Sequence, residues 1–222
     1  MEKSVSTTLI MAGGIIIATA FIQMSSSVKA EAHTMQNGVV QKLSNAMQTV
    51  PDANSTEFTY KFDDSTKTAT VTGLKSSATQ ITIPERVASN GSTYDITSIG
   101  SGAFDGKGLT SVILPQSLIT IESGAFAGNK LSTVVIPDKV ETINAGAFTR
   151  NGMTSVQLGS SVKAIMSGAF ADNQLSTLVL PNGLTTLEGG AFSQNKLTGV
   201  KVPSAVSHPE YAFDYGLKIT TF

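Results

Sequence analysis

One short motif recurs along this chain at a fixed interval. The triplet Gly-Ala-Phe ends at five phenylalanines that stand 22 residues apart, and a shortened copy, Tyr-Ala-Phe, follows. A period of this size is typical of a solenoid, in which one small unit is stacked many times and each copy packs against its neighbours. We therefore expect these side chains to form the structural core: Phe104, Phe126, Phe148, Phe170, Phe192 and Phe213.

The apolar residues between two triplets recur in the same register. In one copy Leu131, Val134 and Ile136 come before Pro137, and Val140 and Ile143 lead to the next triplet. Alternating apolar residues indicate a short strand, and a proline suits its end because it has no N–H to donate. The fold predicted for residues 81–203 is a repeat solenoid of 22-residue coils. It would have parallel strands on one face and short turns or 3-10 segments on the other.

Each coil also carries an asparagine two residues before the next leucine or methionine. Asparagine tolerates left-handed backbone and bonds nearby main chain, so it suits a repeated turn, with a ladder of side chains between coils as a further reading. We also expect the glycine and alanine of each triplet to let neighbouring coils approach closely. The asparagines are Asn129, Asn151, Asn173 and Asn195.

The two ends of a solenoid need caps, because an end coil has a neighbour on one side only. Residues 57–80 contain two alternating runs around Asp63-Asp64, which predicts a β-hairpin as the N-terminal cap. The paired acids fit a solvated turn better than a cation site. Residues 90–92 form an insertion in the first, degenerate repeat, and residues 204–222 are the predicted C-terminal cap.

The first 30 residues have the pattern of an export signal. Lys3 precedes an apolar run from Leu9 to Met24, and Val28 and Ala30 supply the small residues of a cleavage site. An uncleaved anchor is the alternative, because the run approaches the length of a membrane span. Residues 31–56 are a polar leader with helical spacing up to Pro51, which predicts a capping helix or a tether. With the signal removed, we expect no integral membrane span and a secreted or cell-surface location.

The repeats resemble the BspA type of leucine-rich repeat, a bacterial surface subclass. The stretch from Leu131 to Pro137, continued by Ala147-Phe148, carries that pattern almost completely, and the likeness covers about residues 81–213. One departure is Gly159, which stands where the other copies have proline. The resemblance implies binding or adhesion to host or bacterial macromolecules, and the family shares no catalytic residue.

Composition excludes several kinds of chemistry. The chain has no cysteine, and its two histidines, His33 and His208, have no spacing typical of metal ligands or a proton relay. The formal net charge is -1 and the basic residues are scattered, so nucleic acid is not an expected partner. Charged residues are only 14% of the chain, which favours contacts made by hydrogen bonds and shape. We expect no enzyme activity, no metal and no cofactor.

The outward side of the predicted strands is the candidate ligand face. One of its columns is mostly aliphatic and the other is small and hydroxylated, which fits either a binding site or the β-propensity of branched residues. Six strands would give roughly 500 Å², less than the roughly 800 Å² of a standard interface, so weak or multivalent binding is expected. The partner would be an extracellular or surface protein or glycan, or a second copy if the chain is a self-associating structural component of the cell envelope. The candidate residues are Ser111, Ile113, Thr133, Val135, Ser155, Gln157, Thr177, Val179 and Lys201, with Gly199 beside them.

Overall fold

A computed structural model describes residues 11–12, 15–16 and 50–222, and the chain divides into two units, residues 1–49 and 50–222. The first unit contributes the antiparallel pair β1 (Met11–Ala12) and β2 (Ile15–Ile16). The predicted export signal, apart from these four residues, and the predicted leader up to residue 49 lie outside the described residues. Residues 50–56, the rest of the leader, contain turns and no helix, and Asp52 forms a bridge to Ala88.

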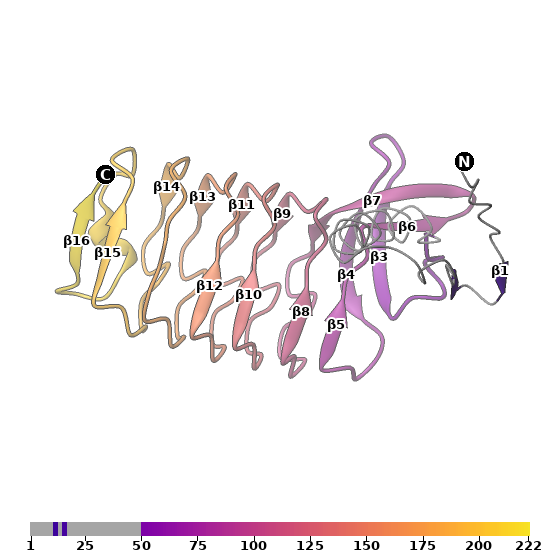
Figure 1. Ribbon diagram of the computed structural model, residues 1–222, viewed down its shortest axis with the longest axis horizontal. Coiled ribbons are helices and arrows are strands. Elements are labelled where there is room, and N and C mark those ends of the chain that lie inside the picture. The colour runs from indigo at the N-terminus through magenta and orange to yellow at the C-terminus, as the bar shows by residue number, and fades with distance from the viewer. Residues whose placement is uncertain (1–10, 13–14, 17–49) are drawn as a thin grey trace, which may run out of the picture. The chain divides into compact units, whose positions relative to one another are not determined.

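The second unit is the expected solenoid, and one of its faces carries the strands predicted from the alternating pattern. We call the face that carries this row of strands the first face (Figure 1). It contains three separate parallel pairs, β5 with β8, β10 with β12, and β15 with β16. The row consists of β5 (Gln80–Thr82), β8 (Ser111–Ile113), β10 (Thr133–Val135), β12 (Ser155–Gln157), the segment Ser176–Leu180, β15 (Gly199–Val202) and β16 (Lys218–Thr221).

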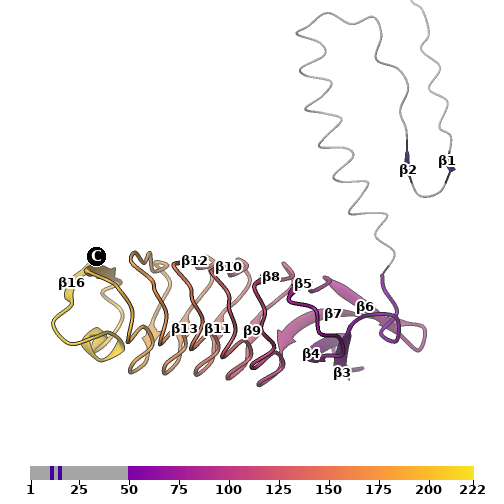
Figure 2. The same ribbon diagram turned by 90° about the horizontal axis from the view of Figure 1, so that it is seen from below.

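Strands also occupy a second face, where the sequence predicted turns or 3-10 segments. The parallel ladder on this face is continuous, and it pairs Ile99, Ile121, Ile143, Ile165 and Leu187 in turn. Each of these side chains is buried and its neighbour points outward, so two residues per coil are enough to form the ladder. Figure 2 shows the two rows on different sides of the coils. The strands are β7 (Ser92–Ile99), β9 (Thr120–Ile121), β11 (Thr142–Ile143), β13 (Ala164–Ile165) and β14 (Thr186–Leu187).

The N-terminal end of the solenoid is closed by the expected hairpin. Strands β3 (Phe58–Asp63) and β4 (Thr68–Leu74) pair antiparallel, and β4 then pairs parallel with β7, so the hairpin extends the ladder of the second face. The insertion after the first repeat is a second hairpin, in which β6 (Arg86–Ser89) pairs with β7. Its turn residues Asn90 and Gly91 have φ of 49° and 75°, as a tight hairpin turn requires.

The predicted core is a stack of phenylalanine rings. All six side chains are buried, and successive ring centroids from Phe104 to Phe192 lie 5.1 to 5.3 Å apart. The last pair, Phe192 and Phe213, is 5.7 Å apart. In the shortened last copy, the 3-10 helix η1 (Pro209–Ala212) replaces the turn, and the N–H of Phe192 still bonds the carbonyl of Ala212 at 2.8 Å.

The repeated asparagines form the ladder between coils. The amide nitrogen of Asn173 donates to the carbonyls of Phe148, Phe170 and Ala171 at 3.0, 3.0 and 3.1 Å. Its amide oxygen accepts the N–H of Met153 at 3.1 Å. The amide nitrogens of the other three asparagines also donate to the phenylalanine carbonyl of the coil before their own. Each side chain therefore satisfies main-chain groups of its own coil and of the preceding one.

The glycine of each triplet has a different role from the one expected. Gly124 has φ of 64°, and an added Cβ would have no heavy atom within 4 Å. The corresponding glycines of the other copies also have φ between 60° and 67°. The glycine is therefore needed for left-handed backbone, which costs L-residues roughly 1–2 kcal/mol, and close approach of coils does not require it. The alanine that follows is buried in every copy.

Candidate ligand-binding face

Two columns of exposed side chains run along the first face. In the three-residue strands the middle residue is directed inward, as Val112 and Val134 show, so the residues on either side point to solvent. Every residue predicted for the ligand face is exposed: Ser111, Ile113, Thr133, Val135, Ser155, Gln157, Thr177, Val179, Gly199 and Lys201.

The first column is aliphatic over most of its length. Ile113, Val135 and Val179 are 60%, 54% and 83% exposed, which is high for such large apolar side chains. Gln157 interrupts the column, and Lys201 is its last predicted member. These residues therefore form an apolar strip with polar groups beside it.

The second column is small and hydroxylated. The hydroxyls of Thr133 and Ser155 lie 3.1 Å apart and form a hydrogen bond between neighbouring coils. Each hydroxyl keeps further capacity to donate or accept, because it is exposed and bonded on one side. This column can therefore offer hydrogen bonds to a ligand that covers the apolar strip.

The structure does not bring all the predicted residues into one sheet. Thr133 and Val135 pair in register with Ser155 and Gln157. Thr177 and Val179 were expected on a strand, but residues 174–180 form none. The strand pairing of the face is therefore interrupted between β8 and β10 and, where a coil forms no strand, between β12 and β15.

Four residues of the face were missed by the sequence analysis. Gln80 and Thr82 on β5 align with Ser111 and Ile113, and Lys218 and Thr220 on β16 align with Gly199 and Lys201. At the N-terminal end of the face, the strand pattern of the degenerate repeat indicated Gln80 and Thr82. At the other end the signal was the alternation around Ile219, although those residues follow a repeat that is shorter than the others.

The charge of the face is confined to its C-terminal end. Among the residues of both columns, Lys201 and Lys218 are the charged ones, and no Asp or Glu belongs to either column. Both lysines are exposed. The face therefore presents neutral side chains along most of its length and two cations at one end.

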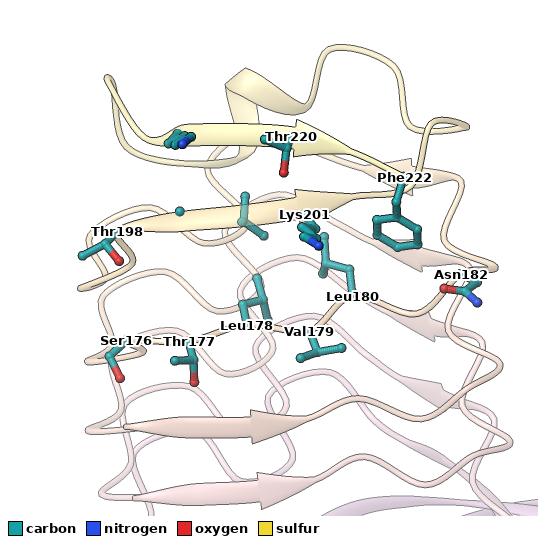
Figure 3. A pocket seen from close by; sticks show the side chains of 13 residues that line it. Ser176, Thr177, Leu178, Val179, Leu180, Asn182, Thr198, Lys201, Thr220 and Phe222 are labelled. Atoms are coloured by element: carbon teal, nitrogen blue, oxygen red, sulfur yellow. The ribbon is translucent and has the colours of Figure 1, made fainter.

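A groove lies at this end of the face. It has a volume of about 750 Å³ and is formed by residues 176–180 and Asn182 on one side and by β15, β16 and Phe222 on the other. Figure 3 shows Asn182 and the ring of Phe222 at one end of the groove and Thr198 at the other. Such a volume is within the range of ligand pockets.

The acidic pair in the N-terminal hairpin forms a hydrogen-bonded turn. The carboxylate of Asp63 accepts bonds from the hydroxyl of Ser65 at 2.6 Å and from main-chain N–H groups of Ser65 and Thr66. These bonds, with those of the Ser65 side chain largest, lower the pKa of Asp63 to about 2. The pKa of Asp64 is lowered mainly by the hydroxyl of Tyr94 and then by Lys67. Asp63 is thus bonded within the predicted turn, and Asp64 joins the turn to β7 through Tyr94.

The remaining titratable candidate, His208, is an exposed residue of the C-terminal turn. Its Nδ1 lies 3.3 Å from Glu210 Oε1, and its ring centroid is 5.8 Å from that of Tyr211. His33 lies outside the described residues. Among residues 11–12, 15–16 and 50–222, no three His, Asp or Glu side chains are grouped so that they could hold a metal ion.

The stacked coils, with parallel strands and a leucine, valine and isoleucine core, define a leucine-rich repeat protein. The BspA-type leucine-rich repeat region matches residues 97–220 in six copies, which is more than half of the 222 residues. The chain therefore belongs to the family of BspA-type leucine-rich repeat proteins.

One solved structure with a TM-score above 0.5 agrees with this fold. The pneumococcal vaccine antigen PcpA is similar over 71% of this chain, with a TM-score of 0.52 and 19% identity. A leucine-rich repeat protein from Bacteroides ovatus is similar over 68% of the chain, with a TM-score of 0.37 and 21% identity. The chain spans 50% of the length of PcpA and 59% of that of the Bacteroides protein. No curated protein sequence matches this chain.

Proposed function

We propose that this protein is a secreted or cell-surface binding protein that holds a protein or glycan ligand on its first face and carries out no catalysis. The observation that carries the proposal is the exposed aliphatic column bordered by hydroxyl groups. Strand propensity alone does not account for this column, because Val179 is 83% exposed and belongs to no strand. Exposed apolar side chains with a polar border are typical of an interaction site.

The size of the face favours weak or multivalent binding. Its strands have three or four residues, so the face is about 10–13 Å wide, and seven rows at about 4.8 Å give roughly 300–450 Å². A standard interface uses roughly 800 Å² from each partner. A ligand with repeated epitopes would compensate through its high effective concentration.

The class of protein and its neighbours support the rest of the proposal. Leucine-rich repeat proteins are generally non-enzymatic. The description of PcpA as a vaccine antigen and the export signal predicted for residues 1–30 both favour a location at the surface. In the part of the chain that the structure describes, no helix is long and apolar enough to cross a membrane.

The test is to place positive charge on the face without altering the core. Changing Thr133, Val135, Thr177 and Val179 to lysine should abolish capture of protein or glycan from surface extracts, because the apolar strip is lost. A matched variant with lysine at four exposed residues off the face, Ile119, Ser123, Ser161 and Gln174, should bind like the wild type. Equal capture by both folded variants would refute the proposal.

A second function, self-association in the cell envelope, is favoured by one edge of the sheet. Strand β16 pairs with β15 on one side, and no described strand pairs with its other side. An open edge can pair with a strand of another molecule. This function predicts oligomers that increase with concentration in sedimentation experiments, and a monomer at all concentrations would contradict it.

A further inference from the structure

The interruption of the first face between β12 and β15 leaves a row of main-chain groups without partners. In neighbouring coils the corresponding groups are bonded: Thr133–Val135 pairs with Ser155–Gln157, and Gly199–Val202 pairs with Lys218–Thr221. No hydrogen bond within the described part of the chain uses a main-chain N–H or C=O group of residues 176–180. The edge of β15 that faces this segment also has no strand beside it.

These groups lie along the groove of about 750 Å³. Exposed main-chain groups in a row are a template for another strand, since an extended chain offers donors and acceptors at the same spacing. The groove runs beside the segment from Ser176 to Leu180 and β15 (Figure 3). Five extended residues span about 17 Å, so a short peptide is the ligand shape that fits this row.

The side chains of the groove indicate the composition of that peptide. Lys201 and Lys218 line the groove, and none of the lining residues is acidic. Val179 and Phe222, which are 83% and 50% exposed, also line it and provide apolar contacts. Successive side chains of a strand alternate in direction, so a peptide with alternating acidic and apolar residues can place carboxylates near the lysines and apolar groups against this wall.

We propose that the groove between residues 176–180 and β15 binds an extended acidic peptide segment of another protein by β-strand addition. This inference rests on the proposed binding function and names the ligand class for one end of the first face. The main-chain bonds supply register, and Lys201 and Lys218 select for acidic segments. The rest of the face then contacts whatever part of the partner lies beyond that segment.

The test uses a fluorescein-labelled heptapeptide of alternating Asp and Val with the full-length protein. We expect saturable binding that weakens at least tenfold when Lys replaces Asp in the peptide, because the groove contains cations and no acid. Two further peptides carry N-methyl groups on alternate main-chain nitrogens, one on the Asp and one on the Val residues. At least one of them should bind about tenfold more weakly, because N-methylation removes the main-chain donors.

Protein variants and amide exchange locate the site. The double change Lys201→Gln and Lys218→Gln should weaken binding of the Asp-Val peptide roughly fivefold, as expected for exposed ion pairs. The matched change Lys107→Gln and Lys130→Gln, at exposed lysines outside the groove, should have no effect. Addition of the peptide should slow hydrogen exchange at the N–H groups of residues 176–180.

The outcomes separate this inference from the proposed function. Equal binding of all four peptides, or unchanged exchange at residues 176–180, would overturn the inference. If the lysine variant of Thr133, Val135, Thr177 and Val179 loses capture of surface extracts while the Asp-Val peptide does not bind, the function stands and the inference fails. Capture that free glycans abolish and acidic peptides leave unchanged would also refute it.

Discussion

At the residue scale, the asparagine ladder shows how one side chain can join two coils. Asn173 is 2% exposed, and its amide group bonds four main-chain groups from two coils. A hydrophobic side chain cannot replace these bonds, because the main-chain groups would stay buried without partners. The repeat therefore requires a polar side chain that both donates and accepts at this otherwise buried position.

The change Asn173→Asp tests this requirement and makes stability depend on pH. The new carboxyl would be buried among three carbonyl oxygens, so its pKa in the folded protein would lie above the ordinary value of about 3.9. Between the pKa of the unfolded state, about 3.9, and the higher pKa of the folded state, the folded state binds more protons than the unfolded state. The free energy of unfolding, relative to wild type, therefore decreases as the pH rises through this interval.

The measurement is urea denaturation at several pH values. At neutral pH we expect Asn173→Asp to lower the free energy of unfolding by several kcal/mol, since each buried group left unpaired costs about 1–3 kcal/mol. Asn173→Leu should show a loss that does not vary with pH in this way, and Asn182→Asp, at an exposed position, should behave like the wild type. A pH-independent loss for Asn173→Asp would contradict this explanation.

At the element scale, the coils of β10 and β12 differ at the residue that ends the strand. The coil of β10 has Pro137 there, and the coil of β12 has Gly159. A Cβ added to Gly159 would lie 2.2 Å from the carbonyl oxygen and 2.7 Å from the carbonyl carbon of Pro137. No side chain fits there unless the two coils separate. The departure from the repeat at Gly159 is therefore a structural requirement of this pair of coils.

We expect Gly159→Ala to lower the free energy of unfolding by about 1–3 kcal/mol, because the added methyl group overpacks main chain that cannot move cheaply. The matched change is Gly183→Ala, where an added Cβ has no heavy atom within 4 Å. It should change stability by less than about 0.5 kcal/mol. Equal effects of the two changes in urea denaturation would show that the contact with Pro137 is unimportant.

The sequence predicted the elements with a clear period and missed those without one. The 22-residue interval predicted the phenylalanine core, the first face and the register of Thr133 with Ser155. The second face was missed because strands of two residues, such as Thr142–Ile143, are too short to show alternation. The Asn90-Gly91 dipeptide is typical of a hairpin turn, but its place outside the 22-residue period predicted only an insertion.

The interruption of the candidate site had no signal in the sequence. The coil that contains Leu178, Leu180 and Pro181 has the same apolar pattern as the coil that contains Val134, Ile136 and Pro137. Only the latter coil forms a strand on the first face. Whether neighbouring strands come within bonding distance depends on how the coils stack, and a pattern within one coil does not contain that information.

At the scale of the whole second unit, the solenoid is a one-dimensional array in which each coil contacts its neighbours. The phenylalanine stack and the second-face ladder repeat without a break from Phe104 to Phe192 and from Ile99 to Leu187. Stability in such an array is approximately a sum over coils and their interfaces. Removal of one complete coil should therefore leave a shorter but folded protein.

We expect deletion of residues 132–153, which joins Leu131 to Thr154, to keep the register and bring Phe126 against Phe170. The protein should show the same type of circular dichroism spectrum, a smaller free energy of unfolding and a smaller m-value, because less surface is buried. Deletion of residues 132–142 removes half a coil, so it shifts every later apolar residue out of register and should prevent folding.

The groove lies beyond the deletion, so the variant that lacks residues 132–153 should still bind the Asp-Val peptide. Its shorter face should capture multivalent ligands more weakly. Loss of peptide binding by this variant in its folded state would mean that the groove depends on coils far from it.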